Sequence, residues 1–125
     1  MPAELAPVVR SFEDTLRLVE GAKEAVVDAV PRGRNPGRSL ADALLEFDER
    51  VREAGASLDA WWHPSVAERW NDCRRGIDQA LARAERLRLD APEFSFDQLT
   101  FTVQDLIAPL EPFEAAMEAF RTLHA

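Results

Sequence analysis

The chain has 125 residues, of which 46% are hydrophobic and 30% are charged, and its formal net charge is −8 at pH 7. This size and balance predict one water-soluble globular domain over residues 1–125, and the acidic charge argues against a nucleic-acid partner because it repels the phosphate backbone. No apolar run reaches the length of about 20 residues that a bilayer-spanning helix needs, so we also expect no membrane contact.

The N-terminal residues and the choice of cations indicate where the protein works. The first residues lack the basic segment and the apolar stretch of a secretory signal, which leads us to expect a cytoplasmic protein. Lys23 is the only lysine, and arginine supplies every other positively charged side chain counted in the net charge. This preference suits a GC-rich genome, so we expect a bacterial source.

Apolar residues recur at helical spacing from about residue 3 to residue 30, and this spacing predicts the first helix. Pro31 ends it, because proline lacks a backbone N–H and disfavours helix at the preceding residue. The next segment, 31–38, combines prolines and glycines with three arginines, which predicts a basic loop. Ser39 is suited to cap the second helix, because its hydroxyl can accept a hydrogen bond from a free amide of the first turn.

Residues 39–88 carry the clearest pattern, with apolar residues in alternating steps of four and three. Only Trp62-His63-Pro64 interrupts it, and proline is best tolerated in the first turn of a helix. We therefore predict two amphipathic helices, over residues 39–62 and 64–88, that pack antiparallel along a narrow stripe. The stripe comprises Leu40, Leu44, Phe47, Val51, Ala54, Leu58, Trp61, Val66, Trp70, Cys73, Ile77, Leu81, Ala84 and Leu87.

A last helix is predicted over residues 96–124. It begins after Ser95, because Ser95 and Gln98 have the types and the spacing of a capping box. The apolar stripe that follows keeps its phase past Pro109 and Pro112, so we predict one helix with a kink near these two prolines. Four helices with mostly short connections predict an all-α fold, an up-down-up-down antiparallel four-helix bundle.

Residue spacing excludes most of the metal and catalytic chemistry known in helical bundles. Iron-carboxylate bundles need Glu-x-x-His motifs, but Ala60 stands three residues before His63, and Arg121 three residues before His124. The chain has no glycine-rich phosphate loop, and its single cysteine, Cys73, falls on the apolar stripe, where we expect a buried thiol. We therefore expect no metal, no cofactor and no enzymatic activity.

Lys23 is an unusual residue because it lies close to a core position of the first helix. Enclosed among apolar side chains, its amine would be able to act as a nucleophile or to bind an anion. Alternatively, Ala22 fills the core position while Lys23 lays its stem along the core and pairs with Glu46 or Glu49. We favour the second interpretation, which makes an enzyme based on Lys23 the most distant hypothesis.

Two places are candidate ligand sites. The topology collects large aromatic residues at one end of the bundle, where either a small-molecule cavity or simple core filling is compatible with the sequence. The basic loop precedes a helix N-terminus, whose free amides and dipole favour an anion, and a solvated loop is the alternative. The candidate ligand-binding residues are Trp61, Trp70 and Phe120 at the aromatic end and Arg32, Arg34 and Arg38 in the loop 32–38.

A further set of apolar residues lies off the helical stripes. Several such residues on the outer faces of the first and fourth helices would form a patch, and patches of this kind usually mark interfaces. Our first hypothesis is therefore a non-enzymatic bundle that acts by protein–protein contact, as a homodimer through these two helices or with another protein. The alternative is a small-molecule or anion-binding regulatory domain. The expected interface residues are Leu18, Val27, Trp62, Phe94 and Phe101.

Overall fold

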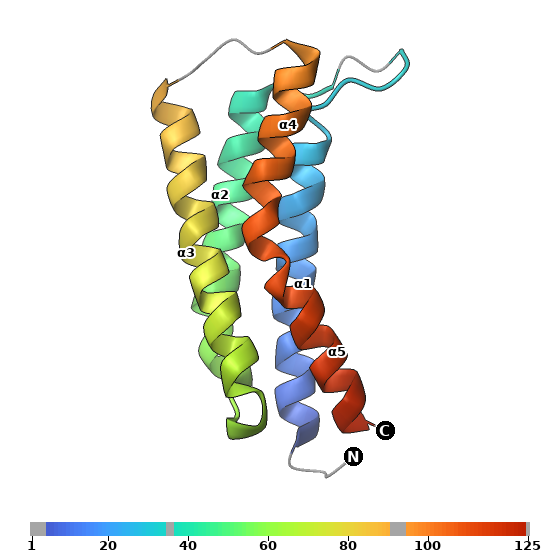
Figure 1. The fold of residues 1–125 in the computed structure, drawn as a ribbon, viewed down its shortest axis with the longest axis vertical. Coiled ribbons are helices and arrows are strands. Elements are labelled where there is room, and N and C mark those ends of the chain that lie inside the picture. Colours follow the sequence, from blue (N-terminus) through green and yellow to red (C-terminus); the bar gives the residue numbers. More distant parts are fainter. Residues whose placement is uncertain (1–4, 35–36, 91–94, 125) are drawn as a thin grey trace.

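The computed structural model describes residues 5–34, 37–90 and 95–124, and these residues form helices and no strands. Four helical rods run side by side along the long axis of the molecule, each antiparallel to the next, and the fourth consists of two helices that meet at a kink (Figure 1). The predicted four-helix arrangement and its kink are therefore confirmed. The elements are α1 (Ala6–Val27), α2 (Leu40–Ala56), the 3-10 segments η2 (Leu58–Trp61) and η3 (Pro64–Val66), α3 (Ala67–Asp90), α4 (Phe96–Ile107), the 3-10 segment η4 (Ala108–Leu110) and α5 (Pro112–His124).

α1 ends at Val27, earlier than the predicted residue 30. Beyond Val27 the winding tightens, and the amide of Ala29 donates to the carbonyl of Val26, three residues back, at 3.1 Å. Such tightening is common at helix ends, where the last carbonyls lack α-helical donors. The amide of Arg38 then donates to the Asp28 carbonyl at 2.9 Å, which closes the loop against the end of the helix. The predicted start near residue 3 lies outside the described residues.

α2 ends at Ala56 instead of residue 62. The Ser57 hydroxyl donates to the Ala54 carbonyl at 2.9 Å and lies 2.5 Å from the Thr15 hydroxyl of α1. A side chain that bonds the backbone in this way competes with the next turn of α-helix. The chain therefore continues as the tighter 3-10 segment η2. This segment extends to residue 61, close to the predicted end of the helix at residue 62.

α3 begins at Ala67, later than the predicted residue 64. His63 is extended (φ −154°, ψ 145°), as expected for a residue that precedes proline. Its Nδ1 atom accepts a hydrogen bond from the Ser65 amide at 3.1 Å, which caps η3 before α3 begins. η2 and η3 thus turn the chain at the end of the bundle where α1 starts and α5 finishes (Figure 1).

Both predicted helix caps are present. The Ser39 hydroxyl accepts a hydrogen bond from the Asp42 amide at 3.4 Å at the start of α2. At the start of α4, the Ser95 hydroxyl accepts from the Gln98 amide at 3.3 Å, and the Gln98 side chain accepts from the Ser95 amide at 3.0 Å. This reciprocal capping box satisfies two amides that the helix itself leaves free.

The kink between α4 and α5 follows from two prolines and is held by α3. Pro109 and Pro112 have no N–H to donate, so the carbonyls one turn earlier lose their usual donors. Arg83 replaces one of these missing donors, because its Nη1 donates to the Asp105 carbonyl oxygen at 2.5 Å. Gly76 makes room for the kink, since a Cβ at that position would overlap the Pro109 carbonyl oxygen and lie 3.2 Å from its carbonyl carbon.

Aromatic rings fill the core at one end of the bundle. Trp61 of η2 packs against Phe12 of α1, with ring centroids 5.0 Å apart, and against Phe120 of α5 at 5.9 Å. Phe12 and Phe120 lie 4.6 Å apart, and Phe113 lies 6.5 Å from Trp61. All four side chains are buried, so three separate elements of the chain meet at one tryptophan.

Candidate interaction surface

The candidate ligand residues at the aromatic end serve as core. Trp61 and Phe120 are buried in the ring cluster described above. Trp70 is half-buried, and its Nε1 donates to the Leu58 carbonyl at 2.8 Å, which ties α3 to η2. The structure therefore brings the three residues to one end of the bundle, where their rings and this hydrogen bond hold the helices together.

The three arginines of the loop 32–38 differ in their surroundings. The side chains of Arg32 and Arg34 are exposed. Arg38 turns back to α2, and its Nη1 lies 2.5 Å from Glu46 Oε2. This hydrogen bond is the main reason why the pKa of the Glu46 carboxyl lies below its usual value, and Arg50 adds to the effect. One of the three arginines that were expected to bind an anion is thus already paired with a carboxylate.

Lys23 lies on the edge of the core. Ala22 is fully buried and fills the core position, while the Lys23 side chain is 16% exposed. Its Nζ lies 3.9 Å from Glu20 Oε1 on the same helix, whereas Glu46, one of its two expected partners, is bound by Arg38. The mostly buried stem agrees with the second interpretation of this lysine, but the carboxylate beside the amine belongs to Glu20, which was not among the expected partners.

Cys73 is buried on α3, and we expect its thiol to be inert. Burial, with a smaller effect of the nearby Asp72 carboxylate, raises its pKa from 9.0 to about 12. Because the folded pKa lies above the unfolded one, the thiol stabilises the fold fully below pH 9 and loses this contribution as the pH rises towards 12. A thiol reagent near pH 8 should label the native protein at least about 100-fold more slowly than the urea-unfolded protein. Equal rates would mean that Cys73 is reachable.

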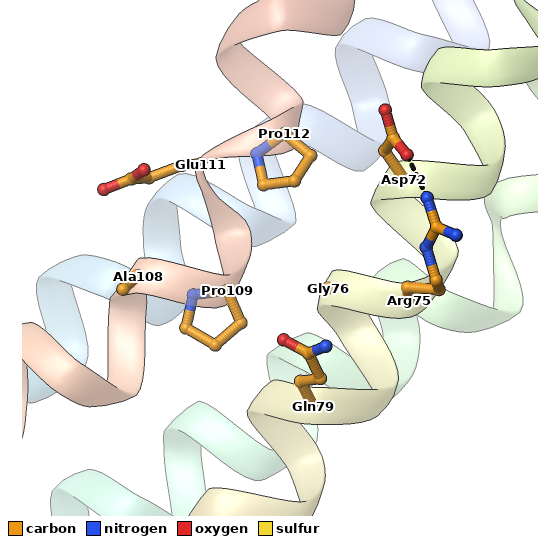
Figure 2. A pocket seen from close by; sticks show the side chains of 8 residues that line it. All are labelled: Asp72, Arg75, Gly76, Gln79, Ala108, Pro109, Glu111 and Pro112. Atoms are coloured by element: carbon orange, nitrogen blue, oxygen red, sulfur yellow. Dashed lines mark hydrogen bonds and ion pairs between the residues drawn. The ribbon is translucent and has the colours of Figure 1, made fainter.

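A groove of about 490 Å³ opens where α3 passes the kink (Figure 2). Gly76 faces Pro109 across its floor, and the Gln79 amide lies beside them. Arg75 is hydrogen-bonded to Asp72 on its own helix, and these two side chains occupy one rim (Figure 2). Two of its polar side chains, Asp72 and Arg75, are thus already paired, and its apolar lining is limited to Ala108 and the two prolines, which is less than a small-molecule site usually has.

A second groove, of about 220 Å³, lies between α1 and α5 beside the aromatic end. Its lining is mostly apolar, with Glu13 and Arg121 among the residues around it. Arg121 Nη1 lies 2.7 Å from Glu118 on α5, so this cation also has a partner within its own helix.

The expected interface residues fall into different environments. Leu18 and Val27 of α1 are half-buried and pack against the core. Trp62 is 47% exposed in the turn between η2 and η3, and Phe101 of α4 is 71% exposed. Phe94 lies outside the described residues. Trp62 and Phe101 belong to segments near opposite ends of the bundle, so the four described residues of this set do not make one continuous patch (Figure 1).

Two further large apolar side chains are exposed. Leu45 on α2 and Leu89 at the end of α3 are 53% and 79% exposed, respectively. The sequence contains a signal for both, because both lie off the stripe. Leu45 directly follows the stripe residue Leu44, and Leu89 stands two residues after the stripe residue Leu87.

Phe101 stands beside a third groove, of about 150 Å³, between α3 and α4, which we call the α3–α4 groove. Leu87 and Leu106 give it an apolar floor, and Arg83 and Arg86 contribute two guanidinium groups. An engineered apolar cavity of comparable size accepts benzene, so the groove has room for one aromatic side chain. The remaining lining residues are Thr102 and Asp105.

The described part of the chain contains no group of three or more metal-ligating side chains, and none of its helices is both long and apolar enough to cross a membrane. Comparison of the chain with protein-family models, with curated proteins and with solved structures found no match.

Proposed function

We propose that this chain is a non-enzymatic helical bundle that acts through protein–protein contact and pairs with a second copy. We place the contact on the face formed by α3 and α4 instead of the expected first and fourth helices, because Leu18 and Val27 of α1 pack against the core. The observation that carries the proposal is the exposure of Phe101, which is 71% accessible beside an apolar-floored groove. Aromatic side chains are enriched at the centres of interfaces, and burying this ring against a second copy would stabilise the dimer relative to the separate chains. The setting that we propose is the cytoplasm, where a free thiol such as Cys73 is usual.

The other candidate functions have less support. A small molecule at the aromatic end would need space that the rings of Trp61, Phe12 and Phe120 occupy. An anion at the start of α2 would compete with Glu46 for Arg38. An enzyme based on Lys23 would need a free amine, and this amine has Glu20 as its neighbour.

The test of self-association is the solution mass at several concentrations, measured by sedimentation equilibrium. The wild type should be a dimer at micromolar concentration, and Phe101→Ser should weaken the dimer by at least about tenfold, because it removes an aromatic anchor from each copy. Thermal unfolding of the variant should stay within about 0.5 kcal/mol of the wild type, because the ring is mostly exposed and is not part of the core cluster.

Leu45→Ser is the matched control, because Leu45 is another exposed apolar side chain but lies on α2. This variant should dimerise like the wild type. A wild type that remains monomeric at every concentration would refute the proposal, and an equal loss in both variants would place the contact elsewhere.

A further inference from the structure

The three grooves described above differ in what they could receive. At the kink, Asp72 and Arg75 pair with each other across part of the rim. Beside the aromatic end, the neighbouring Phe120 is buried, so no ring projects next to that groove. Of these three, the α3–α4 groove is the one that combines an apolar floor, nearby guanidinium groups and a projecting aromatic side chain, Phe101.

We propose that the occupant of the α3–α4 groove is Phe101 of a second copy, and that the two copies exchange this ring reciprocally. This inference rests on the proposed self-association and names its contact. Phe101 stands at the edge of its own groove and remains 71% exposed, so it leaves space there unfilled. A twofold axis that passes between the ring and the groove places each Phe101 in the groove of the other copy at the same time. Such an interface is closed, and it stops at the dimer.

The charges around the groove favour a second copy of this chain. Two acidic residues, Asp97 and Asp105, lie one helical turn before and after Phe101 on α4 and are exposed. When Phe101 enters the groove of the other copy, these carboxylates come to the side of the groove that holds Arg83 and Arg86. Two chains of net charge −8 repel each other over most of their surfaces, so contact is favoured where arginines meet carboxylates.

Asp105 remains available for such a contact although it already faces Arg83. The Arg83 guanidinium is bound mainly to the Asp105 backbone oxygen at 2.5 Å, and its distance to the carboxylate is 3.4 Å. The carboxylate side chain is 57% exposed, which leaves its second oxygen open to an arginine of another copy. Arg86 is exposed on the same face and is the cation best placed to provide it.

The experiment separates the ring from the groove. Phe101→Ala keeps the groove and removes the ring, whereas Thr102→Trp keeps the ring and fills the groove, since Thr102 lines it. Each variant alone should dimerise about 100-fold more weakly than the wild type, because both insertions are lost. In an equal mixture, the ring of the Thr102→Trp copy can enter the open groove of the Phe101→Ala copy. One of the two insertions is then restored, and a heterodimer should form at concentrations where each variant alone is a monomer.

The outcomes distinguish this inference from the proposed function. A dimer that persists in Phe101→Ala, or a mixture that forms no heterodimer, would overturn reciprocal exchange while self-association stands. A wild type that is monomeric at every concentration would overturn both. If Thr102→Trp fails to fold in thermal unfolding, Thr102→Arg fills the same space with a side chain that reaches solvent and replaces it in the mixture.

Discussion

Gly76→Ala is expected to lower the free energy of unfolding by about 2–3 kcal/mol, or roughly 10 °C in Tm. Alanine normally stabilises a helix relative to glycine by up to about 1 kcal/mol, so the expected sign is the opposite of the usual one. The reason is the kink: a methyl group on Gly76 would overlap the Pro109 carbonyl oxygen, and a backbone atom cannot move aside as a side chain can. α3 and the kink would have to separate, which would open the contacts between α3 and α5.

Gly21→Ala is the matched control for this substitution. A Cβ on Gly21 would lie 3.0 Å from Arg50 Nη1, the far end of a flexible side chain that can shift. We therefore expect a stability equal to the wild type or higher by up to about 1 kcal/mol, measured by urea unfolding of both variants. If Gly76→Ala were as stable as Gly21→Ala, the close approach of α3 to Pro109 would be wrong.

Trp61→Ala is expected to cost about 3–5 kcal/mol, the largest effect of any single truncation considered, because it empties the centre of the aromatic cluster. The ring is fully buried and contacts Phe12, Phe113 and Phe120. Its Nε1 has no hydrogen-bond partner among the described residues. Trp61→Phe should therefore cost much less than the alanine variant, since it removes volume but breaks no hydrogen bond.

Trp62→Ala provides the comparison from the next position in the chain. Trp62 is 47% exposed, so its loss should change the unfolding free energy by less than about 1 kcal/mol. Denaturant unfolding of the three variants measures all of these values. Similar losses at Trp61 and Trp62 would contradict the inward and outward placement of the two neighbouring rings.

The helices and the kink could be predicted because their signals are local. The spacing of apolar residues defines each rod, the Ser95 box marks the start of α4, and Pro109 marks the break. The end of α2 was predicted at residue 62 but lies at Ala56, and its cause is not local. Ser57 lies 2.5 Å from Thr15, which is 42 residues away in the chain, and this contact joins the end of α2 to the middle of α1.

The candidate sites were harder to predict because sequence spacing does not reveal partners. The stripe correctly directs Trp61 and Phe120 to one end of the bundle, but only packing shows that their rings fill the space between them. Similarly, Arg38 belongs to a basic segment, and its pairing with Glu46 depends on how the loop returns to α2. Phe101 was identified because a residue off the stripe must face outward or towards a partner.

The kink in the fourth rod also separates the helix that supplies aromatic rings to the core, α5, from the helix that carries the exposed Phe101, α4. α5 supplies Phe113 and Phe120 to the core, and its position is set by Gly76 of α3. The outer face of α4, which carries Phe101, lies on the other side of the break and adds no ring to the core. Substitutions on that face can therefore alter the proposed contact with a second copy without weakening the fold. In evolutionary terms, the proposed contact surface would be free to diverge while selection on stability acts on the buried residues of both helices, such as Leu106 of α4 and Phe113 of α5.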